Sequence, residues 1–158
     1  MEKKKKYNYF HLKWLIKIIL SIFLIFIIIL ILMKWINPPT TTVILAEQLS
    51  LDRKVIQEWR TIDKIGENVI LSVLAAEDSN FCNHYGVDFA EIYKAKEKGF
   101  SRGASTISQQ VSKNLFLWRN RSWFRKGLEL IITMMIETFW SKKRILELYL
   151  NIAETGNG

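Results

Sequence analysis

The sequence predicts a mainly α-helical protein in which a single N-terminal transmembrane helix precedes an all-α domain. Residues 18–33 are apolar except for Ser21, and several later segments repeat apolar residues at the three- and four-residue spacing of one helix face. The sequence shows no convincing alternation of polar and apolar residues, which would indicate half-buried strands. A chain of 158 residues has room for one compact domain beyond the apolar segment.

The apolar segment is predicted to be a signal anchor. With its flanks it reaches the ~20 residues that a bilayer requires. Trp14 and Trp35 lie where interfacial aromatic residues occur. A cleaved signal peptide is the alternative, but residues 33–40 contain no small-x-small cleavage site.

The charges around this segment predict its orientation. Six lysines precede or enter the apolar run, whereas only Lys34 follows it before Arg53. The positive-inside rule therefore predicts a cytoplasmic basic segment over residues 1–13, a span over residues 14–36 and an external domain.

Composition narrows the classes of function. Much of the formal charge of +8 comes from the N-terminal lysines. Beside a membrane span, these lysines fit anionic lipid headgroups, and nucleic acid is not an expected partner. The single cysteine, Cys82, cannot form an internal disulfide, and with one nearby histidine it does not make a metal site.

After the span we expect a juxtamembrane connector over residues 37–58 and one domain over residues 59–158. The connector begins with Pro38-Pro39, which favours an extended exit from the membrane. Gly86 predicts a turn in the loop that contains it. The expected helices cover residues 43–59 (a weak candidate), 65–78, 89–98, 107 onward, 125–140 and 142–151.

The helix over residues 65–78 ends in an acid. Ile70, Val73 and Leu74 repeat at helical spacing, and Glu77 falls on the same stripe. Such a carboxylate either lies in a pocket, where burial raises its pKa toward that of a base, or turns outward to water at the helix end. The helix alone favours neither alternative.

The next helix begins at a local capping signal. Thr106 and Gln109 have the spacing of a capping box, so the helix starts at Ile107. Arg102 and the free amides of this helix start could bind an anion. An ordinary capped helix with a solvated Lys113 is the commoner arrangement. We expect one buried face, made by Ile107, Val111, Leu115 and Trp118.

The last third of the chain combines a basic and aromatic cluster with an apolar core helix. The cluster suits either lipid headgroups or a phosphate-bearing substrate. On the core helix, Glu129 is expected at the margin of the buried face, and Ser141 is expected to cap the last helix. The cluster comprises Trp118, Arg119, Arg121, Trp123, Phe124, Arg125 and Lys126. The residues expected to face the core are Leu128, Ile131, Ile132, Met135, Ile136 and Phe139.

Four ordered motifs resemble those of the peptidoglycan glycosyltransferases, glycosyltransferase family 51. The resemblance covers about residue 59 to the end, together with the anchor, and is similar to the monofunctional biosynthetic branch of Gram-negative bacteria. The motifs are Glu77-Asp78-x-x-Phe81-x-x-His84-x-Gly86-x-Asp88, Gly103-x-Ser105-Thr106-x-x-Gln109-Gln110-x-x-Lys113-Asn114, Arg125-Lys126-x-x-Glu129, and Lys142-x-x-Ile145-Leu146-x-x-Tyr149-Leu150-Asn151.

The resemblance implies a lysozyme-like all-α domain that polymerises lipid II with release of undecaprenyl diphosphate. It implies that Glu77 is the catalytic base, that Asp78 supports it, and that Glu129 is a second essential acid near the donor diphosphate. It assigns substrate binding to Ser105, Thr106, Gln109, Gln110, Lys113, Arg121 and Arg125. It assigns a structural role to Phe81, His84, Gly86, Asp88 and Asn114.

The resemblance also predicts the surroundings of the enzyme. No cofactor is required, although a divalent cation, Mg²⁺ or Mn²⁺, could act beside Glu129. The expected partners are lipid II, the lipid-linked glycan chain, the membrane and the cell-division or elongation machinery. The expected location is the inner membrane, with the catalytic domain in the periplasm.

Two alternatives remain open from the sequence. Family members continue past the equivalent of Gly158, so we expect this chain to be truncated at its C-terminus. Truncation would allow a catalytically inactive membrane-anchored adaptor of the cell-wall machinery. A lysozyme-like glycan hydrolase is the other alternative, but a hydrolase has no need of phosphate-binding Lys113 and Arg121.

Overall fold

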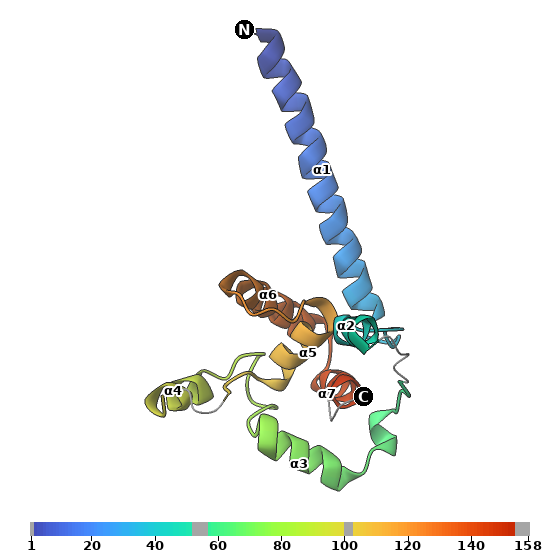
Figure 1. Cartoon of the computed structure of the whole chain (residues 1–158), viewed down its shortest axis with the longest axis vertical. Helices are drawn as coiled ribbons and strands as arrows, with labels where there is room; N and C mark the ends of the chain where they lie inside the picture. The colour runs from blue at the N-terminus through green and yellow to red at the C-terminus, as the bar shows by residue number, and fades with distance from the viewer. Residues whose placement is uncertain (1, 52–56, 100–102, 154–158) are drawn as a thin grey trace. The chain divides into compact units, whose positions relative to one another are not determined.

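The computed structural model describes residues 2–51, 57–99 and 103–153. These residues form helices, turns and loops without a strand, which confirms the predicted fold class (Figure 1). They fall into two compact units, residues 1–36 and residues 37–158. The helices are α1 (Glu2–Leu32), α2 (Thr42–Leu51), a 3₁₀ turn (Ile62–Lys64), α3 (Glu67–Glu77), α4 (Phe89–Glu97), α5 (Ile107–Phe116), α6 (Trp123–Phe139) and α7 (Lys142–Ile152).

The first unit is built on α1. Its part His11–Leu32 is long and apolar enough to cross a membrane. The helix ends at Leu32, and residues 33–36 lie beyond it, so the predicted span over residues 14–36 extends past the helix.

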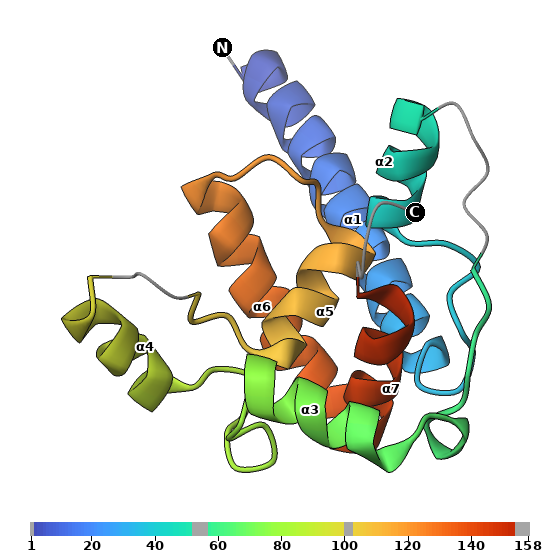
Figure 2. The same cartoon turned by 60° about the horizontal axis from the view of Figure 1, so that its bottom comes forward.

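The core of the second unit lies where α5 packs against both α6 and α7 (Figure 2). Ile107 and Val111 of α5, Ile136 of α6, and Ile145 and Leu148 of α7 are completely buried. Burial of each contributes roughly 1.5–3 kcal/mol relative to exposure. This three-helix core carries the elements that hold the site.

The connector packs on this core through α2. The Thr42 hydroxyl donates to the carbonyl oxygens of Asn114 (2.9 Å) and Leu117 (2.7 Å) at the C-terminal end of α5. These bonds satisfy carbonyls that a helix end leaves without partners. The prediction of a helix over residues 43–59 is wrong at its end, because residues 57–59 are not helical, while residues 52–56 lie outside the described residues.

Two predicted core residues are exposed. Trp118 was expected on the buried face of α5, but the helix ends at Phe116, and Leu117 is buried instead. Ile131 of α6 is likewise exposed. Both errors have one cause: whether an apolar residue is buried can be decided only when the positions of the neighbouring helices are known.

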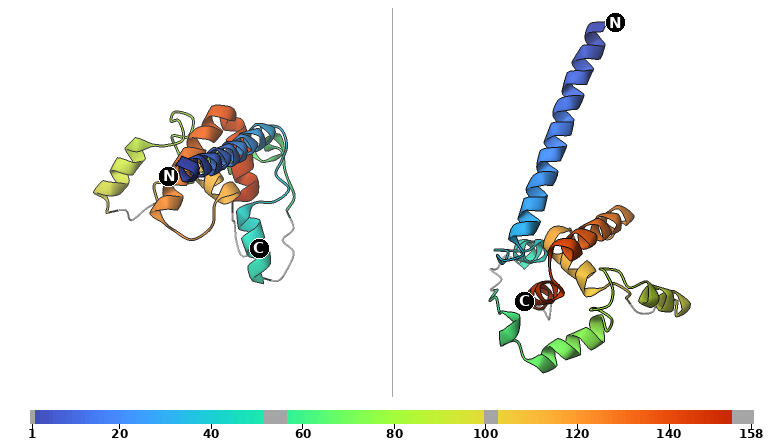
Figure 3. Two further views of the ribbon diagram at one scale, coloured as in Figure 1. Left: turned by 90° about the horizontal axis from the view of Figure 1, so that it is seen from above. Right: turned by 180° about the vertical axis from the view of Figure 1, so that it is seen from behind.

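Helices α3 and α4 stand apart from the three-helix core (Figure 3). No residue of α3 is buried, and Ala95 is the buried residue of α4. The C-terminal end of α3 and the N-terminal end of α4 are joined by residues 78–88. The start of α5 lies against this segment, so three chain segments meet at one place.

Candidate active site

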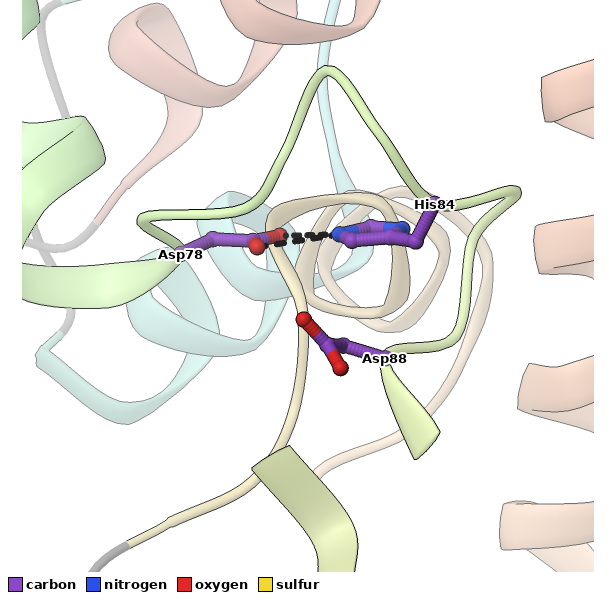
Figure 4. Close-up of side chains that lie close together, drawn as sticks. All are labelled: Asp78, His84 and Asp88. Carbon is purple, nitrogen blue, oxygen red and sulfur yellow. Dashed lines mark hydrogen bonds and ion pairs between the residues drawn. The ribbon is translucent and has the colours of Figure 1, made fainter. Parts of the chain in front are cut away.

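Asp78 and His84 form a buried pair within the segment that joins α3 to α4 (Figure 4). His84 Nε2 lies 2.9 and 3.0 Å from the two carboxylate oxygens of Asp78, and both side chains are almost completely buried. Asp78 Oδ2 also accepts from the backbone amide of Ile107, at the start of α5 (3.0 Å). A carboxylate only accepts, so the proton of His84 lies on Nε2. The predicted structural role of His84 is thus to orient Asp78.

Asp88 caps the start of α4. Its Oδ1 accepts from the amide of Glu91 at 3.0 Å, and its Oδ2 accepts from Asn80 Nδ2 at 2.9 Å. The backbone amide of Glu91 contributes most to holding the pKa of Asp88 below its ordinary value, and burial acts in the opposite direction. Asp88 therefore stays ionised at neutral pH.

The side chains of Asp78, His84 and Asp88 have the composition of a metal site. Their donor atoms lie within 4.8 Å of one another. However, all four carboxylate oxygens already accept hydrogen bonds from the protein. Asp78 accepts three of these bonds, and His84 Nε2 would have to lose its proton before it could bind a cation, so the arrangement fits a positioning network better than a metal site.

The loop is seated on α5 and α6 at Gly86, whose φ of +78° matches the predicted turn. The Thr106 hydroxyl donates to the Gly86 carbonyl at 2.6 Å. A Cβ at Gly86 would lie 2.7 Å from Thr133 Cγ2, so no larger residue fits without a shift of the loop. Phe81, 2 % exposed, fills the space under the loop.

Glu77, the last residue of α3, is exposed. The helix end thus leaves this side chain open to solvent at the edge of a cavity, between the two predicted alternatives. Gln110 Nε2 donates to Glu77 Oε2 at 2.8 Å and fixes its direction. The pKa of Tyr149 on α7 is raised, first by burial and then by the negative charge of Glu77.

A small cavity of about 70 Å³ opens beside Glu77. This volume is below the roughly 300–1,000 Å³ of closed ligand pockets, so the cavity can hold only one part of a larger substrate. Apart from alanine and glycine, its walls are acidic or carry hydroxyl groups. They include Glu77, Asp78, Asp88, Glu91, Ser105 and Thr106.

The predicted capping box at the start of α5 is confirmed. Gln109 N donates to the Thr106 hydroxyl at 3.2 Å, and Thr106 N donates to Gln109 Oε1 at 3.1 Å. Gln109 is therefore buried in the cap and is not among the residues that line the cavity, and its predicted role in substrate binding stays a prediction. Gln110, the next residue, reaches the site through Glu77.

The start of α6 places a buried acid between two cations. Glu129 is 2 % exposed, so the predicted position at the margin of the buried face is wrong. Arg125 Nη1 donates to Glu129 Oε2 at 3.1 Å, and Lys126 Nζ donates to Oε1 at 2.5 Å. Lys126 Nζ also lies 3.3 Å from Ser105 Oγ, on the cavity wall.

This cluster changes two expectations about Glu129. Both of its oxygens are bonded to cationic groups, whose positive charges oppose the binding of a divalent cation beside them. Arg125 is itself buried and directed to Glu129, whereas the prediction placed it on the substrate. Lys126, which the predicted site did not include, is the residue that links Glu129 to the cavity. Its position three residues before Glu129 on one helix was the available signal.

The remaining predicted cations lie on α5 and on the loop that follows it. Lys113 is half-buried and follows Gln110 by three residues, so the two share one side of α5. Arg121 is exposed in the loop before α6. Arg102 lies outside the described residues. Asn114 is buried near the end of α5, where its carbonyl oxygen accepts from Thr42.

Comparison with known proteins places these residues within a known family. The model of the family described as Transglycosylase matches residues 44–158. The match begins inside the predicted connector. Among related proteins, the biosynthetic peptidoglycan transglycosylase of Mannheimia succiniciproducens is 54 % identical over 115 residues, which cover 70 % of this chain and 47 % of that protein.

Two further relatives bear the same description. The protein of Xanthomonas campestris pv. campestris is 46 % identical over 136 residues, with 80 % of this chain and 55 % of the relative covered. The protein of Marinomonas sp. is 48 % identical over 139 residues, with 85 % and 60 % covered. The chain thus spans about half the length of the curated relatives it matches.

Proposed function

This chain belongs to the transglycosylase family, and we propose that it forms part of a peptidoglycan glycosyltransferase that polymerises lipid II into glycan strands. One observation carries the proposal. An exposed carboxylate, Glu77, is held by Gln110 at the edge of a cavity that Ser105 also lines, and Ser105 accepts from the cation Lys126. A base for the acceptor hydroxyl and a cation for the leaving diphosphate are what transfer from a diphosphate donor requires.

In the proposed reaction, Glu77 accepts the proton of the 4-hydroxyl group of the GlcNAc in lipid II. The hydroxyl oxygen attacks the anomeric carbon of the lipid-linked glycan chain, and the β-1,4 bond forms with inversion. The bond to undecaprenyl diphosphate breaks, and the diphosphate leaves with the electron pair. General-base catalysis of this kind contributes about 10²–10⁴-fold to a rate.

The departing diphosphate needs positive charge. We assign this role to Lys113 and Arg121, and we add Lys126, because its ammonium group lies between Glu129 and Ser105. Glu129 then acts by holding Lys126 and Arg125. The proposal includes no step through Mg²⁺ or Mn²⁺, since both oxygens of Glu129 are bonded to these basic groups.

The side chains on the outer face of α6 support the proposal of a lipid-linked substrate and of a location at the membrane. Trp123 is 94 % exposed, and Phe124 and Ile131 are also largely exposed. Trp118 stacks on Phe124 with 6.5 Å between ring centroids. Exposed aromatic and apolar groups beside Arg119 and other basic residues suit the lipid interface.

We therefore propose a single-pass protein of the inner membrane, with its N-terminus in the cytoplasm and this domain in the periplasm. The apolar helix His11–Leu32 supports the anchor, and the flanking lysines support the orientation. An association with cell-division or elongation machinery stays a prediction.

The class of reaction can be tested directly. The protein, as its gene encodes it, is placed in lipid nanodiscs and incubated with fluorescent lipid II and, separately, with purified cell-wall sacculi. We expect glycan polymer from lipid II and no muropeptides from sacculi. Release of muropeptides without polymer would replace the proposed transferase by a hydrolase. Neither product, together with a co-purified cell-wall protein, would favour the adaptor.

A further inference from the structure

We propose that Lys142, the first residue of α7, is a positioning residue of this site. Its ammonium group holds the loop that carries His84 and thereby sets the His84–Asp78 pair beside Glu77. The expected kinetic consequence depends on the proposed function, whereas the expected effect on the environment of His84 does not.

Lys142 has three partners, two in the loop that joins α3 to α4 and one on α6. Its Nζ lies 2.7 Å from the carbonyl oxygen of His84 and 2.8 Å from Glu137 Oε1. It also lies 4.5 Å from the ring centroid of Phe81, within the range of a cation–π contact. An ammonium group has three N–H donors, and these three partners can occupy all of them.

Glu137 explains why Lys142 stays in this place. The Glu137 side chain is 3 % exposed on the inner face of α6, and its Oε1 also accepts from the Ser108 hydroxyl of α5. A buried carboxylate without a cation is strongly unfavourable, so Glu137 retains Lys142. The pair thus joins α5, α6 and α7 under the loop.

A single residue of the loop, His84, connects Lys142 to the site. The backbone carbonyl of His84 is bonded to Lys142, and the ring of His84 is bonded to Asp78 (Figure 4). Asp78 follows Glu77 directly in the chain and is also bonded to the amide of Ile107. A shift of the His84 backbone therefore changes the position of Asp78, while Ile107 keeps the rest of the network in place.

Loss of Lys142 leaves the loop attached at other points. The Gly86 carbonyl still accepts from Thr106, and the hydroxyl groups of Tyr85 and Thr138 still lie 2.6 Å apart. We therefore expect a Lys142→Met variant to fold with a displaced loop. Its stability falls because Glu137 loses its cation, so the experiment must separate that effect from positioning.

The double variant Glu137→Gln, Lys142→Met makes this separation, because it removes the cation and the buried charge together. We expect its thermal midpoint to return close to the wild-type value. We expect its kcat for lipid II polymerisation to stay about 10- to 100-fold lower, with KM changed less than about twofold, as for a small misplacement of a catalytic group. Lys142→Arg should recover part of kcat. Lys143→Met, an exposed neighbour, is the matched control and should keep the wild-type kcat.

A spectroscopic measurement tests positioning without any activity. The chain has two histidines, so ¹⁵N imidazole signals of His84 can be assigned by comparison with a His11→Gln variant. We expect the Nε2–H signal of His84 to shift in the double variant and not in Lys143→Met. Recovery of both kcat and the wild-type His84 signals in the double variant would overturn the proposal. A wild-type protein that makes no polymer would contradict the proposed function, and the His84 signals would still decide whether Lys142 positions the loop.

Discussion

Glu77 and Asp78 are neighbours in the chain with opposite surroundings. Asp78 is 6 % exposed and bonded to His84 and Ile107, whereas Glu77 is exposed and bonded to Gln110 alone among the described contacts. The Asp78 oxygens are taken up by hydrogen bonds within the protein, whereas the accessible Glu77 carboxylate can meet a substrate hydroxyl. The two acids thus suit different roles, Asp78 as a fixed support and Glu77 as the base.

Asp88 gives a prediction about pH at this same scale. Its pKa in the folded protein is lower than in the unfolded chain, chiefly through the amide of Glu91. A pKa that is lowered on folding contributes to the stability of the fold at pH values above the pKa of the unfolded chain. This contribution is lost as the pH falls through the pKa of the folded protein. At pH values below about 4, we expect the urea concentration at the midpoint of unfolding to decrease for the protein in micelles. We expect this decrease to be smaller in the Asp88→Asn variant.

The control for Asp88 is Asp63→Asn, since the Asp63 side chain is largely exposed. Asparagine remains a good helix cap, so Asp88→Asn should lower the midpoint at pH 7 only slightly. An equal acid response in wild type and Asp88→Asn would show that the charge of Asp88 does not stabilise the fold.

At the scale of the element, α6 combines a partly polar buried face with a largely apolar exposed face. Beside the buried Ile132 and Ile136, its buried residues include four polar ones at a spacing of four, namely Arg125, Glu129, Thr133 and Glu137. Its exposed face carries apolar residues, namely Trp123, Phe124, Leu130, Ile131 and Met134. The buried polar residues build the site and the support under the loop, and in the proposed function the exposed apolar face contacts a lipid surface.

The position of α6 at a bilayer can be measured with spin labels. In a background with Cys82→Ser, because Cys82 is exposed, a label at Trp123→Cys is compared with one at Glu97→Cys on α4. In nanodiscs we expect the label at 123 to be more accessible to oxygen than to an aqueous nickel complex. The label at 97 should show the reverse preference. A label at 123 that is as accessible to nickel as the label at 97 would contradict membrane contact.

Local signals predicted the elements well, and long-range packing explains the errors. The caps at Thr106 and Ser141 depend on a few adjacent residues, and both are present. The orientation of α6 could not be read from its sequence, because apolar residues occur around much of its circumference. For that reason Ile131 was placed inward and Glu129 at the margin, and both positions were wrong.

At the scale of the whole molecule, the site is assembled from segments far apart in the chain. The ends of α3 and α4, residues 103–106 and the start of α6 meet around the cavity. The family motifs indicated most of these residues in advance. They did not reveal that Lys126 connects Glu129 to Ser105, or that Lys142 and Glu137 support the loop from below. Those contacts require the three-dimensional packing of α5, α6 and α7.

The rate of lipid II polymerisation by a Glu77→Gln variant tests the central claim most directly. The comparison uses wild type, Glu77→Gln and, as the control, Glu67→Gln at the other end of the same exposed helix. We expect Glu77→Gln to keep the wild-type fold and thermal midpoint and to lose about 100-fold or more in kcat, as expected for loss of a general base. Glu67→Gln should retain the wild-type kcat. A Glu77→Gln variant that polymerises lipid II at close to the wild-type rate would show that Glu77 is not the base.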